Sequence, residues 1–170
     1  MKRLLDLHSK FRTDKAELKR RRRDLGIQQK NSLLLLKIEY NNSLNQAIQV
    51  HQRVLQYIKD ECSHKLQTIH IREREETFTP EELRNLEQLR WEACSEAWER
   101  RDKENKIFRN TEETISKNYI RRMKKLEETY NKEYAEMEIQ RADIITKFDA
   151  DQQKLFDTYR REKAEKGGEA

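Results

Sequence analysis

Apolar residues recur at steps of four, four and three residues along two long stretches of the chain. In the first stretch these positions are Leu36, Tyr40, Leu44, Ala47, His51, Leu55, Ile58, Cys62, Leu66 and Ile69. In the second stretch, which the charged Arg141 interrupts, they are Ile115, Tyr119, Met123, Leu126, Tyr130, Tyr134, Met137, Ile145 and Phe148. An 11-residue repeat averages about 3.67 residues per turn, so each stretch predicts a long helix with one narrow apolar stripe. Because both stretches share this period, we expect the stripes to pack on each other as a helix–helix seam.

A break between the two stretches lies in the segment ETFTPEEL, residues 76–83. Pro80 disfavours a helical conformation at Thr79, so the incoming helix is predicted to end before that residue. A second helix then begins with Thr79 as N-cap, Pro80 at the first helical position and Glu82 completing a capping box. Phe78 and Leu83 occupy the two positions of a hydrophobic staple. Together these signals predict a turn between two helices.

The chain is therefore predicted to be all-α: a long helical hairpin or antiparallel coiled coil, elongated and self-associating. The predicted segments are a basic N-terminal helical segment (1–31), a first coiled-coil arm (32–76), a turn (77–79), a second coiled-coil arm (80–166) and a frayed tail (167–170). One alternative is a kinked rod whose arms pair only with other chains. Another is a three-helix chain, because Gly26 costs about 1 kcal/mol relative to Ala inside a helix.

The composition favours long helices over a compact globule or a disordered chain. Of the 170 residues, 34% are hydrophobic and 41% are charged, with three glycines and one proline. Globular domains are typically about a quarter charged, and disordered chains are usually poor in aromatic residues. The apolar stripe is wider than a two-helix seam requires, because Val50, Val54 and Tyr57 flank it. We therefore expect two hairpins to associate, or the stripe to dock on another protein.

A run of five cations dominates the N-terminal segment: Lys19, Arg20, Arg21, Arg22 and Arg23. Residues 1–30 hold 11 Lys or Arg against 4 Asp or Glu, a net charge of +7, whereas the whole chain carries +5. The protein therefore has one basic end rather than a generally basic surface. Successive residues of a helix are rotated by about 100°, so the five cations surround the helix instead of lining one face. Three interpretations stay open: a solvated helix face, a docking site for an anionic partner, and a nuclear-localisation signal.

Trp91, Trp98 and Phe108 lie on one predicted face of the second arm, together with Cys94. One interpretation is that they fill the seam near the turn. The other is a protein-docking patch, because tryptophans are frequent anchors of protein interfaces. The basic amphipathic segment 115–134 could bind calmodulin or a membrane, but its apolar residues already belong to the predicted seam.

No arrangement of residues in the sequence points to catalysis, and no cofactor or metal is predicted. Cys62 and His64 point about 200° apart on a helix, so they are not expected to share a metal, and His70 falls on a charged flank. The chain has no apolar run of the ~18 residues that a membrane span needs. Its N-terminus lacks the long apolar region of a signal peptide. We therefore expect an intracellular protein whose Cys62 and Cys94 are reduced thiols.

The pattern resembles the broad class of coiled-coil scaffold and cytoskeleton-associated proteins. The resemblance implies a cytoplasmic structural protein that associates with itself and with other helical or acidic proteins, tethering or reinforcing a larger assembly. Its basic segment would dock on an acidic partner. The alternative is a nuclear, chromatin- or RNA-associated dimer with Lys19–Arg23 as binding arm and localisation signal. A membrane partner is disfavoured, because acidic residues are scattered through residues 80–166.

Overall fold

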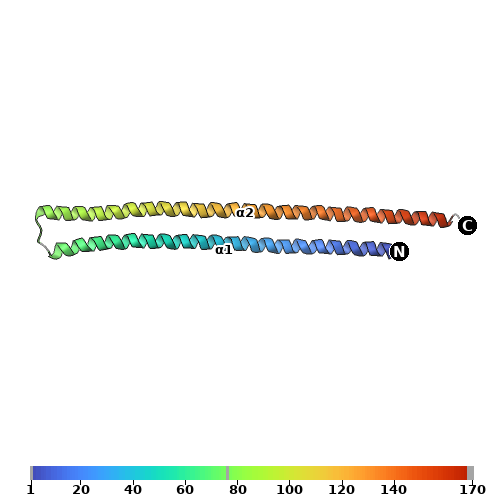
Figure 1. Ribbon diagram of the computed structural model, residues 1–170, viewed down its shortest axis with the longest axis horizontal. Helices are drawn as coiled ribbons and strands as arrows, with labels where there is room; N and C mark the ends of the chain where they lie inside the picture. The colour runs from blue at the N-terminus through green and yellow to red at the C-terminus, as the bar shows by residue number, and fades with distance from the viewer. Residues whose placement is uncertain (1, 76, 168–170) are drawn as a thin grey trace. The chain divides into compact units, whose positions relative to one another are not determined.

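The computed structural model describes residues 2–75 and 77–167, which form two long helices, α1 (Lys2–Glu75) and α2 (Pro80–Gly167). A short turn joins the helices, and they pack against each other as the arms of a hairpin (Figure 1). No strand occurs within the described ranges. The predicted all-α hairpin is confirmed, and a rod whose arms never meet is excluded. Glu76 of the predicted first arm and residues 168–170 of the predicted tail lie outside the described residues.

The hairpin divides into two compact units, each containing part of both helices. The terminal unit comprises Met1–Leu35 with Arg122–Ala170, and the turn unit comprises Leu36–Arg121. The predicted boundary between residues 31 and 32 is not a helix end, because α1 is continuous through it. In each unit, one stretch of α1 packs on one stretch of α2, and the core is the seam between them.

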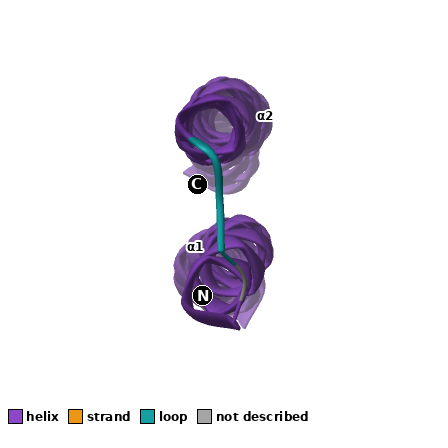
Figure 2. Ribbon diagram, turned by 90° about the vertical axis from the view of Figure 1, so that its left-hand side faces the viewer, coloured by secondary structure: helices purple, strands orange, loops and turns teal. Residues whose placement is uncertain are grey.

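In the turn unit, the seam repeats every 11 residues. On α1 its most buried side chains are Leu36, Ile58 and Ile69, all at multiples of 11 from one another. On α2 the buried side chains are Leu86 and Ala93, and the residues at steps of 11 from Leu86 are half-buried: Ala97, Phe108 and Tyr119. Seen from the turn end, the last turns of α1 and the first turns of α2 are joined by the loop (Figure 2). Helices of equal period keep their stripes facing each other, whereas stripes of unequal period rotate apart.

In the terminal unit, the seam of α1 repeats every seven residues instead. Leu4, Phe11 and Leu18 are half-buried, and Leu25 is only 4% exposed. A period of seven is the heptad of a coiled coil, which holds its seam on one side through slight supercoiling. The basic N-terminal segment is therefore an ordinary part of the hairpin's packing.

The heptad of α1 changes which residues of α2 face it. Ile145, a predicted seam residue, is 42% exposed, whereas the neighbouring Ile144 is half-buried and lies beside Phe11. The α2 seam thus advances from Met137 to Ile144, a step of seven residues. The 11-residue spacing predicted Ile145 as the seam residue. That spacing applies to α2 only where the facing part of α1 has the same 11-residue period.

Gly26 lies inside α1 and does not break it, so the three-helix alternative is wrong. A Cβ built on Gly26 would lie 3.4 Å from the hydroxyl oxygen of Tyr134 across the seam, an ordinary contact distance. The loss of helix propensity at Gly26, about 1 kcal/mol, is smaller than the roughly 2 kcal/mol that burial of the adjacent Leu25 contributes. Packing on α2 therefore keeps the helix continuous.

A capping box begins α2. The Thr79 amide donates to Glu82 Oε2 at 2.7 Å, and the Glu82 amide donates to Thr79 Oγ1 at 3.3 Å. The Leu83 amide donates to the Thr79 carbonyl at 3.1 Å. The hydrogen bond from the Thr79 amide holds the pKa of Glu82 below its ordinary value. These bonds satisfy amides that the first turn of a helix leaves free, so the start of α2 is fixed by local chemistry. Of the staple pair, Phe78 is half-buried and Leu83 is 45% exposed.

Candidate protein-interaction sites

The predicted seam residues other than Ile145 are buried or half-buried. Leu36, Ile58, Ile69 and Tyr130 are buried. The half-buried ones are Tyr40, Leu44, Leu55, Leu66, Ile115, Tyr119, Met123, Leu126, Tyr134, Met137 and Phe148. Aromatic pairs join the helices in both units: Phe11 with Phe148, Tyr40 with Tyr119, and His51 with Phe108. The periodic apolar residues therefore form the seam between the two helices. Candidate sites for binding other molecules must lie outside the seam.

Trp91 and Trp98 lie outside the seam, and each is 70% exposed. Seven residues separate them, so they project toward nearly the same side of α2. Phe108, the third member of the predicted patch, instead stacks on His51 with ring centroids 4.4 Å apart. The set therefore divides into one seam residue and an exposed tryptophan pair.

A groove of about 540 Å³ lies beside Trp98, between α1 and α2 of the turn unit. Its apolar lining consists of Leu55, Ile58, Cys62, Ala97 and Trp98. Its polar lining consists of Gln52, Gln56, Lys59, Ser63 and Arg101, which include two cations and no anion. The Arg101 guanidinium lies 5.8 Å from the Trp98 ring centroid. A concave apolar surface beside an exposed tryptophan is well suited to bind a bulky apolar side chain.

Ion pairs between the helices flank the seam of the turn unit. Arg100 contacts Glu61 at 2.7 Å, and Lys65 contacts Glu96 at 2.7 Å. The hydrogen bond from Arg100 lowers the pKa of Glu61, and the hydrogen bond to Glu96 raises the pKa of Lys65. A shift of one helix along the other would separate these charges, so the pairs favour the observed register.

Part of the predicted anion-binding run is paired within the terminal unit. Arg22 forms an ion pair with Glu138 at 2.6 Å, and Arg21 donates a hydrogen bond to Gln140 at 3.2 Å. The Arg22 and Glu138 side chains are 57% and 48% exposed. Exposed pairs of this kind contribute at most about 1 kcal/mol, so an external anion can compete for Arg22.

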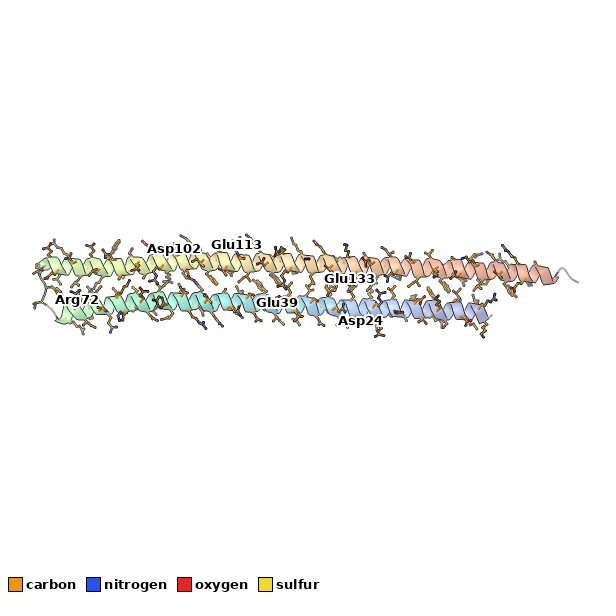
Figure 3. The ribbon with its side chains drawn as sticks, viewed as in Figure 1. Asp24, Glu39, Arg72, Asp102, Glu113 and Glu133 are labelled. Atoms are coloured by element: carbon orange, nitrogen blue, oxygen red, sulfur yellow. The ribbon has the colours of Figure 1, made fainter. Side chains whose placement is uncertain are left out.

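The other cations of the run are more accessible. Arg20 lies 3.8 Å from Asp24, and the Arg20 side chain is 85% exposed. Asp24 is one turn further along α1 and is labelled in Figure 3. Lys19 and Arg23 are exposed and form no hydrogen bond or ion pair with another described residue. The run thus combines two unpaired cations with three that hold weak partners.

Other charged residues pair along their own helix. Asp102 pairs with Lys106 at 2.7 Å, and Glu113 pairs with Lys117 at 2.6 Å. Both acidic residues lie on α2 and are labelled in Figure 3. Each lysine lowers the pKa of its acidic partner. These pairs are more than half exposed, as expected for a solvated helix face.

Soft metal ligands do not cluster in the part of the chain that the structure describes. Among residues 2–75 and 77–167, no three His, Cys, Asp or Glu side chains are placed to hold a metal ion. Cys62 contacts α2, and His70 Nδ1 lies 3.7 Å from Glu73. In the same ranges, no helix has an apolar stretch long enough to cross a membrane.

The sequence did not predict that Cys62 of α1 and Cys94 of α2 are neighbours across the seam. The Cys62 sulfur lies 3.8 Å from the carbonyl oxygen of Ala93, and the adjacent Cys94 raises the pKa of Cys62. The sequence does contain an indication of this pairing, because each cysteine is 16 residues from Phe78 in the turn. Residues equidistant from the turn of an antiparallel hairpin lie at the same level. The sequence analysis compared Cys62 only with His64 and His70 of the same helix, whereas Cys94, its neighbour in the structure, is on α2.

No protein-family model matches this chain, and neither the curated proteins nor the solved structures contain a significant match.

Proposed function

We propose that this protein is a non-enzymatic coiled-coil scaffold that associates with itself through the turn unit and docks an acidic partner on its basic N-terminal segment. The observation that carries the proposal is the exposure of Trp91 and Trp98, each 70% exposed, beside an apolar groove. Tryptophan is costly to leave in water and is enriched where proteins bind one another.

A second copy of the chain is the occupant that this surface favours. A two-fold interface brings the same patch of each subunit together, so the patch must be complementary to itself. The turn unit offers both halves of such a contact, because the exposed Trp98 is a projecting side chain and the adjacent groove has a volume of about 540 Å³. A tryptophan from one copy filling the groove of the other would bury both surfaces.

Sedimentation velocity across a range of protein concentrations tests the association. We expect the wild type to sediment with at least twice the 20.8 kDa mass of one chain. The double variant Trp91→Gln, Trp98→Gln should sediment as a monomer. The matched control is Tyr159→Gln, which removes an aromatic residue of the terminal unit that is 64% exposed and does not line the groove. A monomeric wild type, or a double variant that associates as the wild type does, would overturn the proposal.

The second element of the proposal is the basic segment. Residues 1–30 carry a net charge of +7, while the rest of the chain is slightly acidic. Lys19 and Arg23 have no partner among the described residues, and the partners of Arg20 to Arg22 are exposed and exchangeable. An acidic protein surface would therefore meet the cations on the outer side of α1, and it would compete with Glu138 for Arg22.

Cellular imaging of the tagged protein beside a variant with Arg20 to Arg23 replaced by Gln tests the docking site. A cytoplasmic or fibre-bound wild type whose targeting is lost in the variant supports docking on an acidic assembly. A nuclear wild type would contradict the cytoplasmic scaffold and favour the second candidate, a chromatin- or RNA-associated dimer. That candidate predicts that the affinity for nucleic acid falls steeply with salt. For each phosphate contact, a tenfold rise in salt concentration should lower the affinity about tenfold.

A further inference from the structure

Cys62 and Cys94 face each other between the two helices of the turn unit. The Cys62 sulfur lies 3.8 Å from the backbone carbonyl oxygen of Ala93, the residue before Cys94. The neighbouring Cys94 raises the pKa of the Cys62 thiol, and both cysteines are free and half-buried. Two thiols from different helices are thus held together by the fold.

Small side chains allow the helices to approach closely at this level. Ala93 is 8% exposed, and Ala97 lines the groove one turn further along α2. Helix axes pack about 8–10 Å apart according to the size of the side chains between them, and alanines favour the short end. A disulfide needs its two Cα atoms within roughly 7 Å of each other. The Cys62 sulfur already lies against the backbone of α2 at the residue before Cys94.

The groove gives a small oxidant access to Cys62. Cys62 belongs to the groove lining, as do the cations Lys59 and Arg101, and no acidic residue lines the groove. Positive charge attracts an anionic reagent. A small disulfide that carries carboxylates, such as glutathione disulfide, matches this charge.

We propose that Cys62 and Cys94 form a redox-sensitive dithiol that a low-molecular-weight anionic disulfide oxidises to a disulfide bond between α1 and α2. The Cys62 thiolate attacks one sulfur of the oxidant, forms a mixed disulfide and expels one thiolate. The Cys94 thiolate then attacks the Cys62 sulfur, which forms the Cys62–Cys94 bond and expels the second thiolate. The cysteine pair loses two electrons, the oxidant is reduced to two small thiols, and these take up the two protons that the cysteines release.

The surroundings of Cys62 slow the reaction of its thiol with oxidants. Burial, followed by the neighbouring Cys94, raises the pKa of the Cys62 thiol. Most of Cys62 is therefore protonated at neutral pH and reacts slowly on its own. Once formed, the bond closes a loop from residue 62 to residue 94 that contains the turn. Closing such a loop restricts the unfolded chain, so the oxidised turn unit should resist unfolding more than the reduced one.

The test treats the full-length chain with glutathione disulfide at a protein concentration low enough for it to be monomeric, so that self-association does not cover the groove. Remaining thiols are then alkylated, and the intact mass is measured. We expect a monomer that has lost two hydrogen atoms, carries no alkyl group, and melts at a higher temperature until a reductant is added. Two retained glutathione groups, two alkylated thiols or a disulfide-linked dimer would overturn the proposal.

Matched variants test whether the positions of the two cysteines in the fold, rather than the reactivity of any two thiols, cause the disulfide to form. Cys94→Ser should stop at one glutathione group on Cys62, because the second thiol is missing. The double change Cys94→Ser, Ser95→Cys keeps the composition and the level of the thiol but rotates it by about 100° around α2. It should form no bond within the chain. If that variant closes as fast as the wild type, or if urea-unfolded wild type does, the fold does not position the pair and the proposal fails.

Discussion

Replacing Ile58 with Ala is the most direct test of the seam. Ile58 lies on α1 in the turn unit and is only 6% exposed, whereas Ile107 lies on α2 in the same unit and is 58% exposed. Ile58→Ala and Ile107→Ala remove the same atoms, one set from the seam and one from the surface. Their difference measures burial with the chemistry held constant.

The magnitude follows from the surroundings of Ile58. Ile→Ala removes three carbons at about 0.8 kcal/mol each when they are fully buried, or roughly 2.4 kcal/mol. In a closed core an added cavity cost can bring such changes to about 5 kcal/mol. Ile58 lines the open groove of the turn unit, so water can fill the vacated space and this added cost is small. Ala is also the better helix former by a few tenths of a kcal/mol. We expect a loss of about 2 kcal/mol for Ile58→Ala and roughly zero for Ile107→Ala.

Urea denaturation followed by far-ultraviolet circular dichroism measures both free energies of unfolding. The two variants and the wild type are compared at one low protein concentration, because association stabilises the folded chain. The slope of the free energy against urea should stay constant, so that the midpoint shift reports stability alone. A loss below about 1 kcal/mol for Ile58→Ala would refute the seam. Equal losses for both variants would show instead that a second copy covers Ile107.

Three further outcomes follow from the described contacts. Gly26→Ala should raise the melting temperature, because the gain in helix propensity is about 1 kcal/mol and the new Cβ meets the Tyr134 hydroxyl at an ordinary distance; a lower melting temperature would contradict this. Thr79→Ala should lower the free energy of unfolding by about 1 kcal/mol through loss of the N-cap, and unchanged urea unfolding would count against the cap. Because Arg100 lowers the pKa of Glu61, their ion pair should stabilise the fold fully above pH 4.5, the ordinary pKa, and lose its effect as pH falls through the lowered value. Acid titration of Glu61→Gln should lack that component, and an identical titration curve would exclude it.

The sequence by itself determined the helices and the turn, because both depend on interactions between residues close together along the chain. Thr79, Pro80 and Glu82 specify the end of one helix and the start of the next within four residues. The 11-residue spacing likewise assigns Ile58 and Ile69 to one helix face without knowledge of the partner. Near-neighbour chemistry of this kind can be read from a single sequence.

The tertiary structure alone decided which neighbours meet across the seam. Propensity made a break at Gly26 possible, but packing of the adjacent Leu25 on α2 outweighs it. Ile144 faces α1 in place of Ile145, because the heptad of α1 sets the step that α2 must follow. Cys62 lies next to Cys94 although the two are 32 positions apart in the chain, because the turn sets the register of the two helices. Each of these outcomes depends on the energy of contacts between segments that are distant in the chain. The residue pattern of one helix does not contain that information.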